Sequence, residues 1–183
     1  MKRQNGFTLI EVAIVVTILG VVLLAAVMLA RGTQGAYESL SQDTELNFYL
    51  RRALEKMTDE LRRCTLAQIT IENSDPGADA VEFSLPLGVS TDTVIWGAEG
   101  QPGWRVRFLV EDGVLVRRVV DGTGTIRTMD QVLATGVDGL RDGRKGFSVA
   151  GSDSLFTLSL RLVTRDHGRQ WRREISTAVS LRN

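Results

Sequence analysis

The longest run of mainly apolar residues in this chain lies near its N-terminus, from Phe7 to Ala30. The run contains one charged residue, Glu11, and the two hydroxyls of Thr8 and Thr17. At 1.5 Å per residue, a helix of this length measures roughly 36 Å, which can span a bilayer core of about 30 Å with some tilt. We therefore expect residues 7–30 to form a transmembrane helix.

The helical pattern continues beyond this run. Apolar residues between Leu46 and Cys64 recur at steps of three or four, and charged residues lie between them. This spacing predicts one apolar stripe along a helix. We expect a single helix from Phe7 to about Arg63, whose amphipathic part, residues 31–63, packs its stripe on a sheet. Two helices that break at Gly32–Gly35 are the alternative.

The remaining residues, 64–183, show the period-two alternation of β-strands. Two pairs of alternating segments are separated by short turn sequences, which is typical of hairpins. The two pairs are Trp104–Val110 with Val114–Val120, and Phe156–Leu162 with Trp171–Leu181.

Three shorter strands are also expected, near Gln68–Glu72, Val81–Leu85 and Thr93–Trp96. Residues Gly139–Ser154 are rich in glycine, aspartate and arginine, and we expect a long loop there. The pattern as a whole predicts an α+β fold, in which a long N-terminal helix packs on an antiparallel β-sheet head.

Two basic residues, Lys2 and Arg3, precede the apolar run. The positive-inside tendency places the N-terminus in the cytoplasm and the head on the other side of the membrane. A removable signal peptide is the competing interpretation. Its apolar region is usually about 7–15 residues long and ends in a small-residue cleavage site, whereas this run is longer and has no clear site after Ala30.

The start of the run resembles the N-terminal signal of the type IV pilin and pseudopilin superfamily. That signal is a short basic leader, a glycine, an apolar and usually aromatic residue, and then Thr-Leu-Ile-Glu before a long apolar helix. Each part is present here, at Lys2, Arg3, Gly6, Phe7 and Glu11. The resemblance implies that a membrane-embedded prepilin peptidase cleaves between Gly6 and Phe7, removing the leader peptide of residues 1–6. It also implies N-methylation of Phe7.

Glu11 has a physical reason to need a partner. A carboxylate inside a membrane costs about 3 kcal/mol or more. Cleavage would create a new α-amine on Phe7, about one helical turn from Glu11. We expect Glu11 to form a salt bridge with the Phe7 amine of a neighbouring subunit. That bridge would disfavour the unassembled state and set the stagger of the assembled one. The alternative is an acid that snorkels to the membrane interface.

The later part of the chain resembles the J-type minor pseudopilins and related minor pilins. The resemblance rests on three soft cues, at Arg51–Arg63, Val137–Arg141 and Ser176–Asn183. Many major pilins carry a proline in the second half of the membrane helix, and this chain has none there, which favours a minor subunit.

This resemblance implies a minor pseudopilin that helps to form or prime the filament tip of a type II secretion system. The alternatives are a minor pilin of a type IV pilus and a single-pass, membrane-anchored, exported binding domain. The implied partners are the prepilin peptidase and N-methyltransferase, other subunits that contact the N-terminal helix, and an inner-membrane assembly platform. The implied location is the inner membrane, with the head in the periplasm, and then the filament.

Composition and charge change this picture little. Lysine plus arginine and aspartate plus glutamate each number 22, so no dominant field for nucleic acid is expected. Basic pairs and clusters at Arg117-Arg118, Arg141–Lys145 and Arg172-Arg173 are interpreted as solvated strand faces, with DNA or acidic partners as the alternative.

The sequence does not suggest a catalytic site, a cofactor or a metal site. The one histidine, His167, falls in a turn, and the one cysteine, Cys64, falls on the apolar stripe, which predicts a buried thiol. No metal-ligand, phosphate-loop or Ser/His/Asp spacing occurs. Two aspartate pairs, Asp75/Asp79 and Asp138/Asp142, are read as turn residues because neither follows a calcium-loop spacing.

Overall fold

The computed structural model describes residues 8–73, 75–152, 154–166 and 168–181. Its one long helix, α1, runs from Leu9 to Leu61. The helix passes through Gly32–Gly35 without interruption, so the alternative of two separate helices is wrong. The helix thus ends two residues before the predicted end at Arg63. A turn after Leu61 leads to a short 3₁₀ helix, η1 (Leu66–Gln68).

The chain divides into two compact units. The first is Met1–Gln42, and the second, which we call the head, is Asp43–Asn183. Helix α1 contributes to both, and its residues from Asp43 to Leu61 belong to the head.

The head holds three antiparallel sheets among its described residues. The largest has the order β1-β2-β6-β7-β8, with bounds Ile69–Glu72, Ala80–Phe83, Arg105–Glu111, Val114–Val120 and Gln131–Thr135. A second sheet has the order β11-β10-β9, with bounds Arg169–Ser180, Leu155–Asp166 and Phe147–Ser152. The third has the order β3-β4-β5, with bounds Leu85–Ser90, Thr93–Ala98 and Gln101–Pro102.

Both predicted hairpins are present. Strands β6 and β7 pair from Arg105↔Val120 to Glu111↔Val114. The turn between them, Asp112-Gly113, has φ values of 50° and 74°, the two left-handed positions that a type I′ hairpin turn requires. Strands β10 and β11 pair over twelve residues each, and the predicted turn residue His167 lies outside the described residues.

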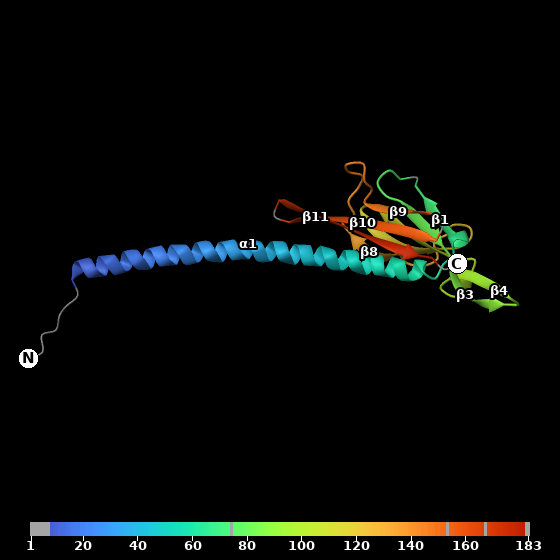
Figure 1. Ribbon diagram of the computed structural model, residues 1–183, viewed down its shortest axis with the longest axis horizontal. Coiled ribbons are helices and arrows are strands. Elements are labelled where there is room, and N and C mark those ends of the chain that lie inside the picture. Colours follow the sequence, from blue (N-terminus) through green and yellow to red (C-terminus); the bar gives the residue numbers. More distant parts are fainter. Residues whose placement is uncertain (1–7, 74, 153, 167, 182–183) are drawn as a thin grey trace, which may run out of the picture. The chain divides into compact units, whose positions relative to one another are not determined.

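One hydrophobic core joins α1 to the sheets, and Figure 1 shows the strands lying against the part of the helix that belongs to the head. The predicted apolar stripe is buried, as expected for a helix that packs on a sheet. Its buried members are Leu46, Leu50, Leu54, Met57, Leu61 and Cys64. A fully buried leucine of this kind contributes about 2 kcal/mol, so this stripe provides much of the attachment.

The expected long loop at Gly139–Ser154 is partly wrong, because strand β9 occupies its second half and pairs with β10. Phe147 and Val149 alternate with small residues and point into the core. At Gly151 a Cβ atom would lie 2.5 Å from the Leu155 carbonyl oxygen, so glycine is required by a close approach of two strands.

The strand expected at Val81–Leu85 is divided. Strand β2 ends at Phe83, and Leu85 begins β3 in the third sheet. Strands β5 and β8 were not expected, because each is short and lacks a clear alternation of its own.

Candidate functional site

The candidate site lies at the start of α1. Thr8 precedes the helix, and its backbone N–H and its hydroxyl donate to Glu11 Oε2 at 3.0 and 3.1 Å. In return, the Glu11 backbone N–H donates to Thr8 Oγ1 at 3.4 Å. This reciprocal pair is a capping box, which satisfies donors that the first helical turn leaves unpaired.

The capping box gives Glu11 a local partner that the analysis of the sequence missed. The signal was present, since a threonine followed three residues later by a glutamate before an apolar run is the pattern of such a cap. The favourable end of the helix dipole adds to this, because Glu11 lies in the first turn. In the single chain, the carboxylate is therefore stabilised by hydrogen bonds, but it forms no ion pair with a basic side chain of the described residues.

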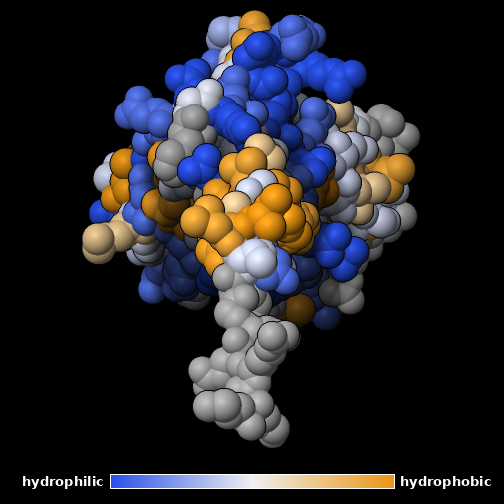
Figure 2. Space-filling model, turned by 90° about the vertical axis from the view of Figure 1, so that its left-hand side faces the viewer, coloured by the Kyte–Doolittle hydropathy of each residue, from blue (hydrophilic) through white to orange (hydrophobic). Residues whose placement is uncertain are grey.

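The segment that follows Glu11 is built to contact an apolar medium. Residues Leu9–Thr33 are long and apolar enough to cross a membrane, and none of this surface is buried within the chain. Figure 2, which views the helix from its N-terminal side, shows the nearest of these side chains as an orange surface. The Thr17 hydroxyl donates to the Ala13 carbonyl at 2.8 Å, and the Thr33 hydroxyl donates to the Ala30 carbonyl at 2.9 Å. Both hydroxyls are thus satisfied inside the helix, which lipid requires.

Four of the predicted site residues, Lys2, Arg3, Gly6 and Phe7, lie outside the described residues. Of the proposed ion pair, the structure therefore describes Glu11 alone. Cleavage after Gly6, methylation of Phe7 and pairing of its amine with Glu11 stay predictions.

A comparison with family models gives one match, to the prokaryotic N-terminal methylation motif, over residues 1–27. The match begins in the basic leader and ends within the apolar helix, so it covers the whole candidate site. The N-terminal segment of the chain therefore carries the motif of type IV pilin-like proteins. No curated protein and no solved structure matches it.

The motif implies processing by a prepilin peptidase and assembly with other pilin subunits. The apolar helix next to the motif is consistent with anchoring in a membrane.

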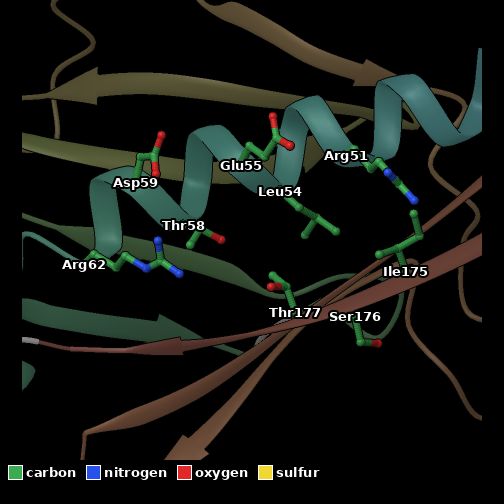
Figure 3. Close-up of a pocket in the computed structure, with 9 residues that line it drawn as sticks. All are labelled: Arg51, Leu54, Glu55, Thr58, Asp59, Arg62, Ile175, Ser176 and Thr177. Atoms are coloured by element: carbon green, nitrogen blue, oxygen red, sulfur yellow. The ribbon is translucent and has the colours of Figure 1, made fainter.

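The head offers a groove between α1 and β11, which Figure 3 shows in close-up. Its volume is about 380 Å³. Leu54 and Thr58 of the helix point toward the strand, and Ile175 and Thr177 of β11 point toward the helix. The lining is completed by Ser176 of β11 and by four charged helix residues, Arg51, Glu55, Asp59 and Arg62. Two charges of each sign and a small apolar floor suit a polar protein contact better than a small-molecule site.

Within the described ranges, no three His, Cys, Asp or Glu side chains lie close enough together to hold a metal ion. Asp138 lies 3.2 Å from Arg161 Nε and 2.7 Å from Arg172 Nε, so its carboxylate is engaged by arginines. Asp75 accepts the backbone N–H of Gly77 at 2.7 Å, as a turn residue does. Cys64 is fully buried, as predicted from the apolar stripe.

Proposed function

We propose that this pilin-like protein is a minor pseudopilin, a structural subunit that helps to form or prime the tip of a type II secretion pseudopilus. In this account the protein first waits in the inner membrane with its N-terminus in the cytoplasm and its head in the periplasm. Prepilin peptidase removes residues 1–6, and Phe7 is methylated. Methylation keeps the positive charge of the Phe7 amine.

The observation that carries the proposal is Glu11, an acid in the first turn of an otherwise apolar helix that bears the methylation motif. Hydrogen bonds from Thr8 reduce the cost of this carboxylate in the single chain but leave its charge unbalanced. The amine of Phe7 on a neighbouring subunit would balance it. Assembly then releases free energy that an isolated helix cannot obtain.

Two features favour a minor subunit. The head is rich in strands and large for a filament whose N-terminal helices must pack side by side. The apolar helix has no proline, so local melting of the kind that a proline permits is not built into it. The soft cues at Arg51–Arg63, Val137–Arg141 and Ser176–Asn183 favour the J-type among minor subunits.

A minor pilin of a type IV pilus is the second candidate, because the motif at residues 1–27 is common to pilins and pseudopilins. Deletion of the gene in the source organism separates the two. The pseudopilin account expects loss of protein secretion with surface pili intact. Loss of pili with normal secretion would assign the protein to the pilus.

The assembly role is tested by Glu11→Leu. We expect this variant to insert in the membrane and to be cleaved after Gly6, yet to be absent from sheared filaments, because the charge that pairs with the Phe7 amine is gone. Immunoblots of membrane and sheared-filament fractions measure this. Normal incorporation of the variant would contradict the proposed pairing.

Three matched variants separate the charge from the cap. Glu11→Gln keeps an oxygen that Thr8 can donate to but removes the charge, so it should fail like Glu11→Leu. Thr8→Val removes the capping hydroxyl and keeps the charge, so it should still enter filaments. Thr17→Val alters a hydroxyl that is satisfied within the helix and serves as the control.

A further inference from the structure

A pocket in the head lies where β10 and β11 meet the segment that precedes β9. It has a volume of about 510 Å³. Its lining is entirely charged and comprises Asp142, Arg144, Arg161, Arg172 and Glu174. Three of these residues belong to the basic clusters that the sequence displays at Arg141–Lys145 and Arg172-Arg173, which the proposed function leaves unexplained.

The floor of this pocket is a buried arginine. The side chain of Arg161 is only 6% exposed. Its Nη2 donates to the carbonyl oxygens of Gly139 and Arg144 at 2.8 and 2.9 Å, and its Nε lies 3.2 Å from Asp138 Oδ2. These contacts fix the guanidinium in place from three directions.

A second arginine shares the same acid. Arg172 Nε lies 2.7 Å from Asp138 Oδ2, the oxygen that Arg161 also approaches. Two guanidinium groups thus depend on one carboxylate, and one positive charge remains unbalanced at the floor. The contacts with Asp138 Oδ2 are ion pairs without hydrogen-bond geometry, since this oxygen and both Nε atoms are enclosed and make no hydrogen bond among the described residues. Arg172 Nη2 is also enclosed and has no hydrogen-bond acceptor there. A buried donor without an acceptor is costly and indicates a missing partner.

The acids at the rim do not supply that partner. Glu174 lies 3.9 Å from Arg144, and Asp142 lies 4.0 Å from Arg141, so each has an arginine of its own. Asp142 is 85% exposed and faces water. The rim is therefore close to neutral, while the floor carries one net positive charge.

The floor is held rigidly before any ligand arrives. The Arg161 backbone N–H donates to the Gly146 carbonyl at 2.7 Å, and the Asp138 backbone N–H donates to the Arg161 carbonyl at 3.0 Å. A Cβ atom on Gly146 would lie 1.5 Å from the Asp138 carbonyl oxygen, so only glycine permits this approach. Lys145, the residue before Gly146, pairs with the buried Asp79. A site fixed in this way loses little entropy on binding.

We propose that this pocket binds a carboxylate group, carried by an aspartate, a glutamate or the C-terminus of a protein partner. A carboxylate matches the single excess charge, and its two oxygens match the parallel N–H groups of arginine. A doubly charged phosphate would exceed that charge and face Glu174 and Asp142 at the rim. This inference is independent of the type of filament that the subunit joins.

The test uses the full chain in detergent micelles, with sodium acetate as the probe. Acetate replaces chloride at constant ionic strength and pH 7, and the midpoint of thermal unfolding is followed by tryptophan fluorescence, since all three tryptophans lie in the head. Acetate that binds a site in the folded state raises the unfolding midpoint, and the rise levels off as acetate fills that site. We expect a saturable rise for the wild type. Absence of any saturable rise would overturn the proposal.

Variants locate the effect. Arg172→Gln removes the guanidinium of a side chain that is partly exposed as a whole, and it should weaken acetate binding about tenfold, the effect of one charge-assisted hydrogen bond. Arg144→Gln, at the rim, should weaken it less. Arg105 lies on the five-stranded sheet, away from the pocket, and pairs there with Glu82 at 3.0 Å. The control variant Arg105→Gln should therefore bind acetate like the wild type. Equal responses in wild type and Arg172→Gln would contradict the assignment even if Arg161→Gln fails to fold.

Inorganic phosphate at the same ionic strength distinguishes the ligand class. Weaker binding of phosphate than of acetate supports a carboxylate. Phosphate that saturates the Arg172-dependent response about tenfold more tightly would overturn the assignment and make this a phosphate site.

Discussion

Glu11 combines two kinds of interaction that belong to different stages. In the single chain its carboxylate accepts hydrogen bonds from Thr8 across the first helical turn. In the proposed filament it faces a positive charge on a neighbouring subunit. The first interaction makes the acid tolerable in the membrane, and the second makes assembly favourable. An acid that had only the charge of the neighbouring subunit, and no hydrogen bonds from Thr8, would cost more free energy to insert into the membrane before assembly.

Cys64 illustrates how burial controls a single thiol. Burial raises the pKa of Cys64 to about 12, with the nearby Glu60 adding to the rise. The thiolate is the reactive form, so we expect no reaction with a thiol reagent at pH 8 in the folded protein. The same reagent should label one thiol per chain in 6 M guanidinium chloride. Rapid labelling without denaturant would show that the stripe around Cys64 opens.

Asp121 should make the head sensitive to acid. Its carboxylate accepts from the Thr123 hydroxyl at 2.6 Å and from Arg127 Nε at 2.7 Å, and these bonds hold the pKa of Asp121 well below its usual range. A lowered pKa stabilises the folded state above the unfolded value of about 4, and that stability is lost as the pH falls below it.

We therefore expect the wild-type unfolding midpoint to decrease between pH 5 and pH 3, and Asp121→Asn to decrease less over the same window. Thermal melts at several pH values measure the two slopes. Asp92→Asn, at the exposed tip of the β3–β4 hairpin, is the matched control. Identical slopes for wild type and Asp121→Asn would contradict this role.

At the scale of elements, a buried ion pair ties the helix to the sheet. Glu60 of α1 accepts from Arg117 Nε of β7 at 3.0 and 3.1 Å, and both side chains are almost fully buried. Arg117 Nη2 also donates to Glu99, in the turn between β4 and β5, at 2.9 Å. One arginine thus connects the helix, the five-stranded sheet and the β3-β4-β5 sheet.

Removal of that arginine should leave the buried Glu60 with Lys56 alone, a half-exposed lysine whose Nζ lies 3.0 Å from Glu60 Oε1. We expect Arg117→Leu to lower the free energy of unfolding of the head by about 3 kcal/mol, because the loss of one partner of a buried ion pair is costly and Lys56 holds Glu60 from the solvent side only. The double variant Glu60→Leu/Arg117→Leu should lose less than the single one. Denaturant titration followed by tryptophan fluorescence measures both. Arg105→Leu, at an exposed pair, should lose under about 1 kcal/mol. If the double variant loses as much free energy of unfolding as Arg117→Leu, or more, the proposed role of this ion pair is contradicted.

The sequence predicted the elements whose periodicity is long and regular. The helix, its buried stripe and both long hairpins follow from apolar spacing alone. Strand β9 was missed because Phe147 and Val149 are its only large residues, and the serine, alanine and glycine that make up the rest resemble a loop. Strands β5 and β8 are short, and pairing with a neighbour rather than their own pattern defines them.

The functional features divide in the same way, into those with a local sequence signal and those that depend on contacts between distant segments. The methylation motif and Glu11 are local signals, so the sequence revealed them. The Thr8 cap is also local and was overlooked. The arginine pocket could not be inferred, because it depends on Asp138 meeting Arg161 and Arg172 across segments that are far apart in the chain.

For the whole molecule, one helix serves two environments. Its residues before Asp43 expose apolar side chains on all faces of the Leu9–Thr33 span, whereas those from Asp43 onward bury one stripe in the head. The head then presents charged grooves and pockets, and the span presents an unpartnered apolar surface. A filament subunit needs both kinds of surface on one chain.

The central claim is that this chain is a processed filament subunit whose functional N-terminus is Phe7. Mass spectrometry of the intact protein, purified from membranes of the source organism, tests it most directly. The account predicts a chain that lacks residues 1–6 and begins with N-methylated Phe7. A chain that still begins with Met1, or one cleaved beyond Ala30, would contradict it.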